Sequence, residues 1–174
     1  MLILACIIVL VLVLTVKITG IDYLYIALLF LPFIDVKWKP PVLSIKTRQD
    51  IFFISVCLAC IAILLLLQPQ HLSYFFAMLL LTALPEEWFF RGYLYNRLLS
   101  RPGATGWKSN LITSVAFTAL HLVANPGILA FLVLFPSLLF GWVYQKTGSI
   151  YLVILLHALS NLIFIGHLQS LLKI

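Results

Sequence analysis

Long runs of apolar residues without any charge are the feature that most limits the fold, and residues 51–67 are a clear example. As a helix, such a run crosses most of a bilayer's hydrocarbon core, which is about 30 Å thick. Only 9% of the residues are charged, against about 25% in a typical soluble domain. A β-barrel would instead alternate apolar and polar residues over segments of about ten. The sequence therefore predicts an all-α fold, a polytopic bundle of transmembrane helices embedded in the lipid bilayer.

Proline, glycine and charged residues divide the apolar runs into about seven predicted spans, within a range of about six to eight. The spans cover residues 1–17, 20–36, 50–68, 71–99, 109–125, 127–145 and 149–166. Residues 1–16 lack a basic start and a small-residue cleavage site, so we expect a retained helix there rather than a signal peptide. With no internal repeat and no linker, residues 1–174 are predicted to form one integral membrane domain.

Lysine and arginine residues predict the orientation of the chain in the membrane. With seven spans, eight basic residues fall on one side and two, Lys17 and Lys173, on the other. The eight are Lys37, Lys39, Lys46, Arg48, Arg97, Arg101, Lys108 and Lys146. Positive residues favour the cytoplasmic side, so the N-terminus is expected in the cytoplasm. The net charge of +6 lies in short loops, which argues against a nucleic-acid partner. A compact membrane chain of this kind suits a prokaryotic cytoplasmic membrane.

Two adjacent glutamates, Glu86 and Glu87, stand inside the predicted span 71–99. A carboxylate in the hydrocarbon core costs roughly 2.5–3.5 kcal/mol on insertion scales, so such residues usually have partners and a function. Glu87 and Arg91 are four residues apart on a helix and can form an ion pair. Glu86 is rotated by about 100° from Glu87. We therefore expect Arg91 to serve Glu87 and leave Glu86 available for chemistry.

Three further polar residues, His121, His157 and Asn161, lie inside other predicted spans. With a rise of about 1.5 Å per residue, they reach depths near the bilayer midplane that overlap the depth of Glu86. A carboxylate beside histidines can take a proton from water, and His and Asn side chains can donate to an oxyanion. The pattern favours hydrolysis. Asn125, four residues after His121, and Trp88, next to Glu87, are candidates for supporting contacts.

The same residues carry a resemblance to a known family. Residues 85–92, P-E-E-W-F-F-R-G, resemble the E-E-x-x-x-R motif of the CPBP intramembrane proteases, the group of CAAX-processing and bacteriocin-processing enzymes. Residues 117–121 resemble its F-x-x-x-H motif, which adds Phe117 to the candidates for supporting contacts. Residues 157–161 resemble its H-x-x-x-N motif. All three motifs occur in the family's order.

The resemblance implies a glutamate-dependent endopeptidase with a protease-like core over residues 71–166. In such an enzyme the first glutamate of the pair, Glu86, activates water. The histidines and the asparagine complete the site, and the second glutamate and the arginine support it; these are His121, His157, Asn161, Glu87 and Arg91. The substrate implied is a membrane-associated peptide or protein, and prenylated CAAX tails, leader peptides and sorting tails all fit. No metal or other cofactor is expected.

Two other functions fit parts of the pattern. A zinc-dependent membrane protease could use two histidines and Glu86 as ligands, although the H-E-x-x-H helix of many zinc proteases is missing. A non-catalytic transporter or immunity protein could use a midplane acid-histidine cluster. We expect Cys57 and Cys60 to be ordinary residues of a membrane helix. Trp38, Trp107 and Trp142 are predicted to lie at the membrane interface.

Overall fold

The computed structural model describes residues 7–9, 11, 12, 14, 24–41 and 47–164. All regular secondary structure in these ranges is helical, which confirms the predicted all-α fold for this part of the chain. Most of the predicted span 1–17, and the ends of the spans 20–36 and 149–166, lie outside the described residues. The number of spans therefore stays a prediction.

The first described helices belong to the predicted spans 20–36 and 50–68. Helix α2 (Leu24–Phe30) continues into the 3₁₀ helix η1 (Leu31–Ile34), and the chain is then irregular up to residue 41. Helix α3 (Arg48–Leu67) follows. It begins with a capping box, because the Thr47 hydroxyl accepts from the Asp50 amide at 3.1 Å and the Asp50 carboxylate accepts from the Thr47 amide at 2.9 Å. These bonds satisfy backbone donors that a helix start leaves free.

The predicted span 71–99 is helical throughout, but it is not a regular α-helix. After the 3₁₀ turn η2 (Pro69–His71) come α4 (Leu72–Ala77), π-helix η3 (Met78–Ala83), α5 (Leu84–Glu87), π-helix η4 (Trp88–Tyr95) and α6 (Asn96–Leu99). Pro85 lacks an amide hydrogen and cannot bond the carbonyl four residues earlier, which disturbs the ladder before the glutamates. The two glutamates thus lie on a short α-helical turn between two π-helical segments, a feature often found at functional sites.

Four helices complete the described chain: α7 (Gly106–Ala124), α8 (Ile128–Leu132), α9 (Leu134–Thr147) and α10 (Ile150–Ile163). Side-chain oxygens of Thr105 and Ser149 cap the starts of α7 and α10. Gly148 ends α9 with a φ of 65°, a left-handed conformation that glycine adopts without steric cost. The chain therefore turns sharply from α9 into α10.

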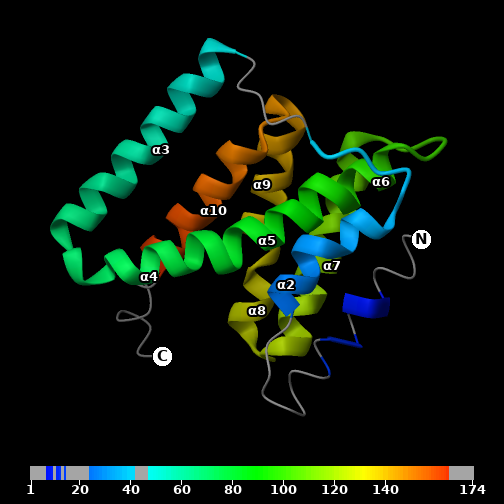
Figure 1. The fold of residues 1–174 in the computed structure, drawn as a ribbon, viewed down its shortest axis with the longest axis horizontal. Coiled ribbons are helices and arrows are strands. Elements are labelled where there is room, and N and C mark those ends of the chain that lie inside the picture. Colours follow the sequence, from blue (N-terminus) through cyan, green and yellow to red (C-terminus); the bar gives the residue numbers. More distant parts are fainter. Residues whose placement is uncertain (1–6, 10, 13, 15–23, 42–46, 165–174) are drawn as a thin grey trace.

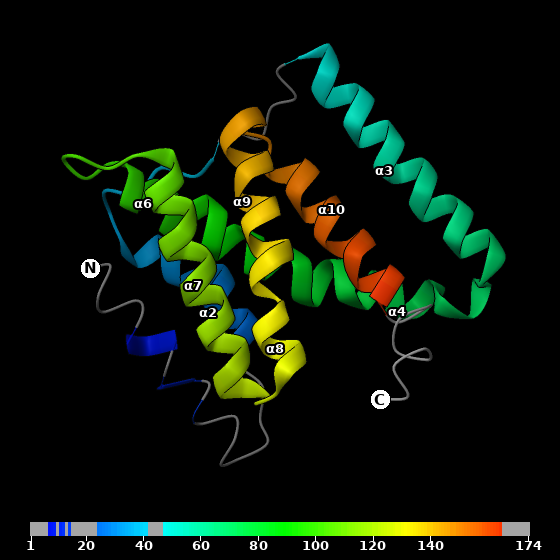
Figure 2. The same ribbon diagram turned by 180° about the vertical axis from the view of Figure 1, so that it is seen from behind.

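The helix from α4 to α6 crosses the molecule, and α7, α9 and α10 pack beside it (Figure 1). The view from behind shows α7, α9 and α10 in front of that helix, with α3 packed along α10 (Figure 2). Helices α7 and α9 approach closely at Gly141, which has no side chain. A Cβ atom there would overlap the Asn110 amide oxygen. The turns after α6 and α9 and the start of α3 lie toward one end of the molecule in both views.

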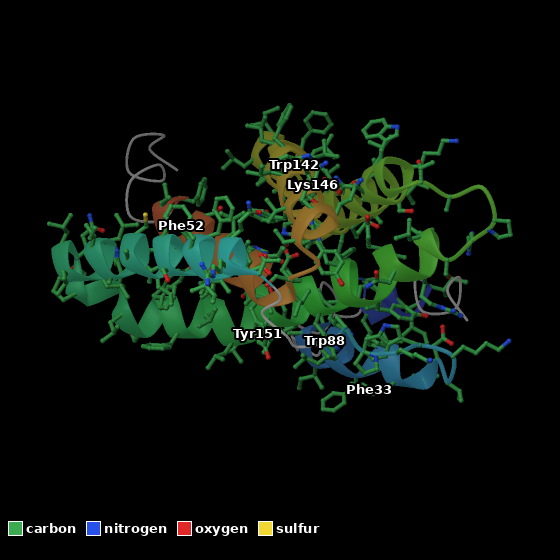
Figure 3. The ribbon with its side chains drawn as sticks, turned by 90° about the horizontal axis from the view of Figure 1, so that it is seen from above. Phe33, Phe52, Trp88, Trp142, Lys146 and Tyr151 are labelled. Carbon is green, nitrogen blue, oxygen red and sulfur yellow. The ribbon has the colours of Figure 1, made fainter. Side chains whose placement is uncertain are left out.

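Two helices of the described chain, Arg48–Leu67 and Ile128–Thr147, are long and apolar enough to cross a membrane, with mean hydropathy of 2.8 and 1.9. Residues 24–34 and 150–163 are shorter apolar helices. Phe52 on α3 and Trp142 on α9 lie on the outer surface (Figure 3). Trp107 is exposed as well, but Trp38, which was predicted at the membrane interface, is only 8% exposed and packs inside the protein.

Candidate active site

The predicted ion pair between Glu87 and Arg91 forms in the interior of the protein. Arg91 Nη1 lies 3.1 Å from Glu87 Oε1, and both side chains are fully buried. Arg91 Nη2 donates to both the backbone carbonyl and the hydroxyl of Ser137 on α9, at 2.8 and 2.7 Å. A buried ion pair is tolerated only when such additional hydrogen bonds compensate for lost hydration. Ser137 therefore supplies two acceptors to Nη2 of Arg91, while Nε has no partner among the described residues.

His157 on α10 joins the two glutamates of α5. Its Nδ1 lies 2.8 Å from Glu87 Oε1, and its Nε2 lies 3.7 Å from Glu86 Oε2. The carboxylate of Glu87, paired with a guanidinium, can only accept hydrogen bonds, so Nδ1 of His157 carries the hydrogen. This fixes the orientation of the ring and directs Nε2 toward Glu86. The sequence did not predict that Glu87 would bind His157 in addition to Arg91.

Glu86 has fewer partners than Glu87. The residue is only 3% exposed, and its Oε2 accepts no hydrogen bond from the described residues. Arg91 does not bind it, as the helical geometry predicted, and His157 Nε2 lies 3.7 Å from its Oε2. Burying a carboxylate oxygen without a donor costs free energy of folding, and proteins usually retain such a group only where it has a function. Glu86 therefore has the chemical freedom that a general base needs.

Aromatic rings from two helices form the wall around these charges. The Phe117 ring of α7 and the Phe140 ring of α9 have their centroids 5.1 and 5.9 Å from the Arg91 guanidinium carbon. The His157 ring stacks on Phe140, with centroids 5.2 Å apart. These contacts place the cation over negative ring faces and fill the space that water would otherwise enter. Phe117, a predicted supporting residue, thus contacts Arg91 directly.

His121 approaches the cluster from α7. Its Nδ1 bonds the backbone carbonyl of Phe117 at 3.0 Å, and its ring lies 4.4 Å from the Phe117 ring. A carbonyl can only accept, so Nδ1 carries the hydrogen in this bond. The Phe117 ring is in turn 6.1 Å from His157. Phe117 therefore separates the two imidazoles at one edge of the site.

The other predicted residues are not joined to the charged groups by the contacts of the described residues. Asn161 is half-buried one turn after His157 and makes no side-chain hydrogen bond to the described chain. Asn125 is exposed at the end of α7, where its backbone amide bonds the His121 carbonyl at 2.8 Å. Trp88 packs its ring against Phe33 and Trp38. The contacts of the described residues bring neither Asn125 nor Trp88 to a carboxylate oxygen.

Sequence reasoning missed two residues of α9 that contact the site, Ser137 and Phe140. Ser137 is a buried polar residue in an otherwise apolar span, and Gly141 follows it by four residues. Small residues four apart mark close helix contacts in membranes, so this pair was a usable signal. Phe140 carries no such signal, because an aromatic residue in a membrane span is ordinary.

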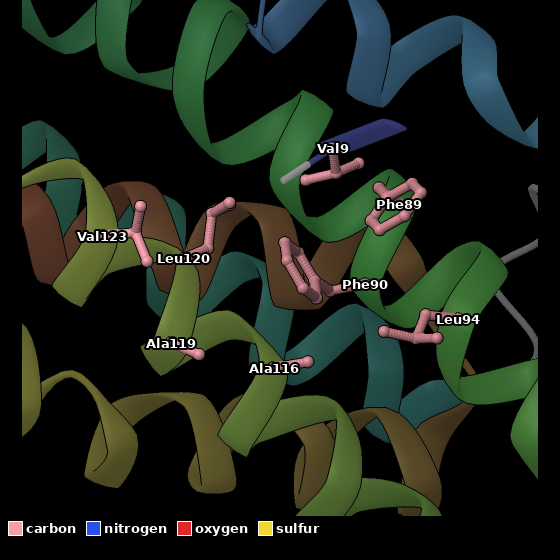
Figure 4. Close-up of a pocket in the computed structure, with 8 residues that line it drawn as sticks. All are labelled: Val9, Phe89, Phe90, Leu94, Ala116, Ala119, Leu120 and Val123. Carbon is pink, nitrogen blue, oxygen red and sulfur yellow. The ribbon is translucent and has the colours of Figure 1, made fainter. Parts of the chain in front are cut away.

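Two other features of the described residues bear on ligands. No three His, Cys, Asp or Glu side chains in this part of the chain form a group that could hold a metal ion. An apolar pocket of about 200 Å³ lies between η4 and α7, and its lining includes Phe90 and Leu120 (Figure 4). The centroids of the Phe90 and Phe117 rings are 5.0 Å apart. These two rings therefore connect the pocket wall to Arg91, which contacts Phe117.

Comparison with known proteins identifies the family. The family model described as type II CAAX prenyl endopeptidase Rce1-like matches residues 68–163, more than half of the chain. No curated protein and no solved structure gives a match. The matched range contains all three motifs, from Glu86 to Asn161. The members of this family are proteases, which hydrolyse peptide bonds. The chain therefore belongs to the Rce1-like family of type II CAAX prenyl endopeptidases, which are integral membrane proteases.

Proposed function

We propose that the protein cleaves a peptide bond of a membrane-associated substrate with a water molecule activated by Glu86. One observation carries this proposal. The buried Glu86 carboxylate has an oxygen without a hydrogen-bond donor among the described residues, 3.7 Å from Nε2 of His157. The other ring nitrogen of His157 is held by Glu87, which Arg91 neutralises. One glutamate thus has structural partners and the other is available for proton transfer.

In the proposed reaction, Glu86 takes a proton from water while the oxygen forms a bond to the scissile carbonyl carbon. The carbonyl oxygen becomes an oxyanion, to which the Asn161 amide and Nε2–H of the imidazolium form of His121 donate hydrogen bonds. When the oxyanion collapses, the C–N bond breaks and Glu86 returns the proton to the leaving amine. In its imidazolium form, with hydrogens on both ring nitrogens, His157 directs Nε2–H toward Glu86 and stabilises the carboxylate before and after this transfer.

Glu87 and Arg91 act on this chemistry through His157 and do not contact the substrate. Glu87 fixes the hydrogen on Nδ1 of His157, so the nitrogen facing Glu86 is always Nε2. Arg91 balances the charge of Glu87 and links α5 to α9 through Ser137. The proposed roles require no metal or other cofactor.

The membrane arrangement that we propose has about seven spans, an N-terminus in the cytoplasm and one domain over residues 1–174, with the protease core at 71–166. Support comes from the connections with basic residues, which lie toward one end of the molecule (Figures 1 and 2). We place the protein in a prokaryotic cytoplasmic membrane. Its substrate is a membrane-associated peptide or protein, and the family description favours a prenylated C-terminus.

The experiment that tests the proposed function compares purified protein and its Glu86→Gln variant in liposomes. A farnesylated peptide ending in a CAAX sequence and the same peptide without the lipid serve as probes. We expect the protein to release the C-terminal residues of a probe and the variant to release none. Product from the variant at the rate of the unchanged protein would contradict the assignment.

A further inference from the structure

The segment that joins η1 to the loop before α3 packs on the helix that carries the glutamates. Residues 35–41, called the 35–41 segment here, have no regular helix or strand, yet they include two buried side chains. Asp35 is 3% exposed and Trp38 is 8% exposed. An irregular connection in a membrane protein usually stays at the surface in water. The burial of these residues therefore points to a specific function.

Three contacts fix the 35–41 segment on η4 and α6. The Asp35 carboxylate accepts from Arg97 at 2.8 Å and from the Tyr93 hydroxyl at 3.2 Å. The Trp38 indole nitrogen donates to the backbone carbonyl of Gly92 at 3.1 Å. A Cβ atom at Gly92 would lie 3.4 Å from the Pro41 ring, an ordinary van der Waals distance, so the segment packs directly against this turn of the helix.

The carbonyl bound by Trp38 belongs to a turn where the helix is π-helical. In a π-helix the amides bond carbonyls five residues earlier, which shifts carbonyls away from their usual partners. Neighbouring side chains then have to satisfy the displaced groups. Here the side-chain Nδ2 of Asn96 lies 3.1 Å from the Arg91 carbonyl and 3.0 Å from the Gly92 carbonyl, and the Trp38 indole adds a third hydrogen bond. The π-helical turn is thus held partly by bonds from outside the helix ladder.

This turn contains Arg91, and the position of its guanidinium determines where the side chains that it bonds can lie. The guanidinium bonds Glu87 one turn earlier and Ser137 on α9, and Glu87 in turn bonds His157 on α10. A change of pitch at Gly92 would move Arg91 along and around the helix axis. Because Arg91 bonds Glu87 and Glu87 bonds His157, this movement would also shift the His157 imidazole relative to Glu86.

We propose that the 35–41 segment positions the candidate active site around Glu86 and Glu87. The Trp38 hydrogen bond to the Gly92 carbonyl fixes the π-helical turn, and this turn holds Arg91, Glu87 and His157 in their relative positions. The Asp35 contacts with Tyr93 and Arg97 fasten the segment to the same helix. Trp38 does not touch the reacting atoms, so it is a positioning residue. This role rests on the proposed function, because the site that it positions is the one assigned there to catalysis.

The test uses Trp38→Phe, which keeps an aromatic ring for the packing against Trp88 and Tyr93 but removes the N–H donor. Asp35→Asn is a second variant that weakens the fastening, and Trp107→Phe, at an exposed position of α7, is the control. Rates on the farnesylated CAAX peptide are measured in liposomes. The proton on Nδ1 of His157 is observed by NMR of histidine-labelled protein in detergent, without substrate.

For Trp38→Phe we expect kcat to fall on the order of 10- to 100-fold, the loss that a misplaced catalytic group causes, with KM changed less than about twofold. The His157 proton should shift, since its bond to Glu87 changes length. Asp35→Asn should change both readouts in the same direction, and Trp107→Phe should change neither.

An unchanged kcat in Trp38→Phe would overturn the positioning role, and so would a raised KM with kcat intact, because that result would mean substrate contact. Failure of the proposed function has a different signature. If Glu86→Gln stays active while Trp38→Phe shifts the His157 proton and lowers kcat, the base is misassigned but the segment still positions the site.

Discussion

His157 Nδ1 and Glu87 Oε1 lie 2.8 Å apart, and the same carboxylate oxygen is 3.1 Å from Arg91 Nη1. One oxygen thus accepts from two donors on different helices, while Glu87 Oε2 has no partner among the described residues. The arrangement connects α5, η4 and α10 through a single atom. It also distinguishes the two glutamates, because Glu87 Oε1 accepts from two donors, whereas Glu86 Oε2 accepts from none among the described residues.

The first prediction concerns the buried Glu87–Arg91 pair. Arg91→Ala leaves the Glu87 charge buried without its cation, which typically costs about 3–5 kcal/mol. We expect a lower yield of folded protein and a reduced melting temperature, measured by size-exclusion chromatography and thermal unfolding in detergent. Arg101→Ala, at an exposed loop position, is the control and should change neither quantity. Equal stability of the two variants would show that the pair does not hold the bundle together.

The second prediction tests the close contact of α7 with α9. Gly141→Ala places a methyl group where the Asn110 amide lies, and forcing helices apart in a packed interior costs about 1–3 kcal/mol. Helix α9 carries Ser137 and Phe140, so activity should fall together with the melting temperature. Gly127→Ala is the matched control, since no atom lies within 4 Å of the added carbon there. A fully stable and active Gly141→Ala variant would contradict the close packing.

Sequence reasoning succeeded where the argument is local. The spacing of Glu87 and Arg91 on a helix was enough to predict their ion pair, and a period of 3.6 residues separated Glu86 from Arg91. Residues 35–41 could not be predicted in this way. Trp38 was predicted at the membrane interface because tryptophan is enriched there, but the Gly92 carbonyl that it binds is 54 residues away in sequence. Partners at such distances depend on tertiary packing, as do Ser137 and the π-helical turns.

The third prediction concerns metal dependence. The proposed reaction uses a carboxylate, two imidazoles and an amide, so purified protein should keep its activity after treatment with a chelator. Elemental analysis should find no stoichiometric zinc. If a chelator removes activity and zinc restores it, Glu86, His121 and His157 would have to be reassigned as metal ligands.

The fourth prediction concerns topology in the membrane. Single cysteines at Ser44 and Ser100, in a protein whose native cysteines have been replaced, should react with an impermeant reagent from the cytoplasmic face. A cysteine at Ser170 should react only from the opposite face if the chain has seven spans. Reaction of Ser170 from the same side as Ser44 would mean that one span has been miscounted.

The central claim is that Glu86 is the base and Glu87 the structural acid, and a comparison of Glu86→Gln with Glu87→Gln tests it most directly. Both variants change one carboxylate to an amide of the same shape on the same helical turn. Glu86→Gln should fold with normal yield and melting temperature and should release no product from the CAAX peptide. Glu87→Gln should instead lower the melting temperature, because the buried Arg91 guanidinium loses the negative charge that balances it. Normal turnover by a well-folded Glu86→Gln variant would contradict the account.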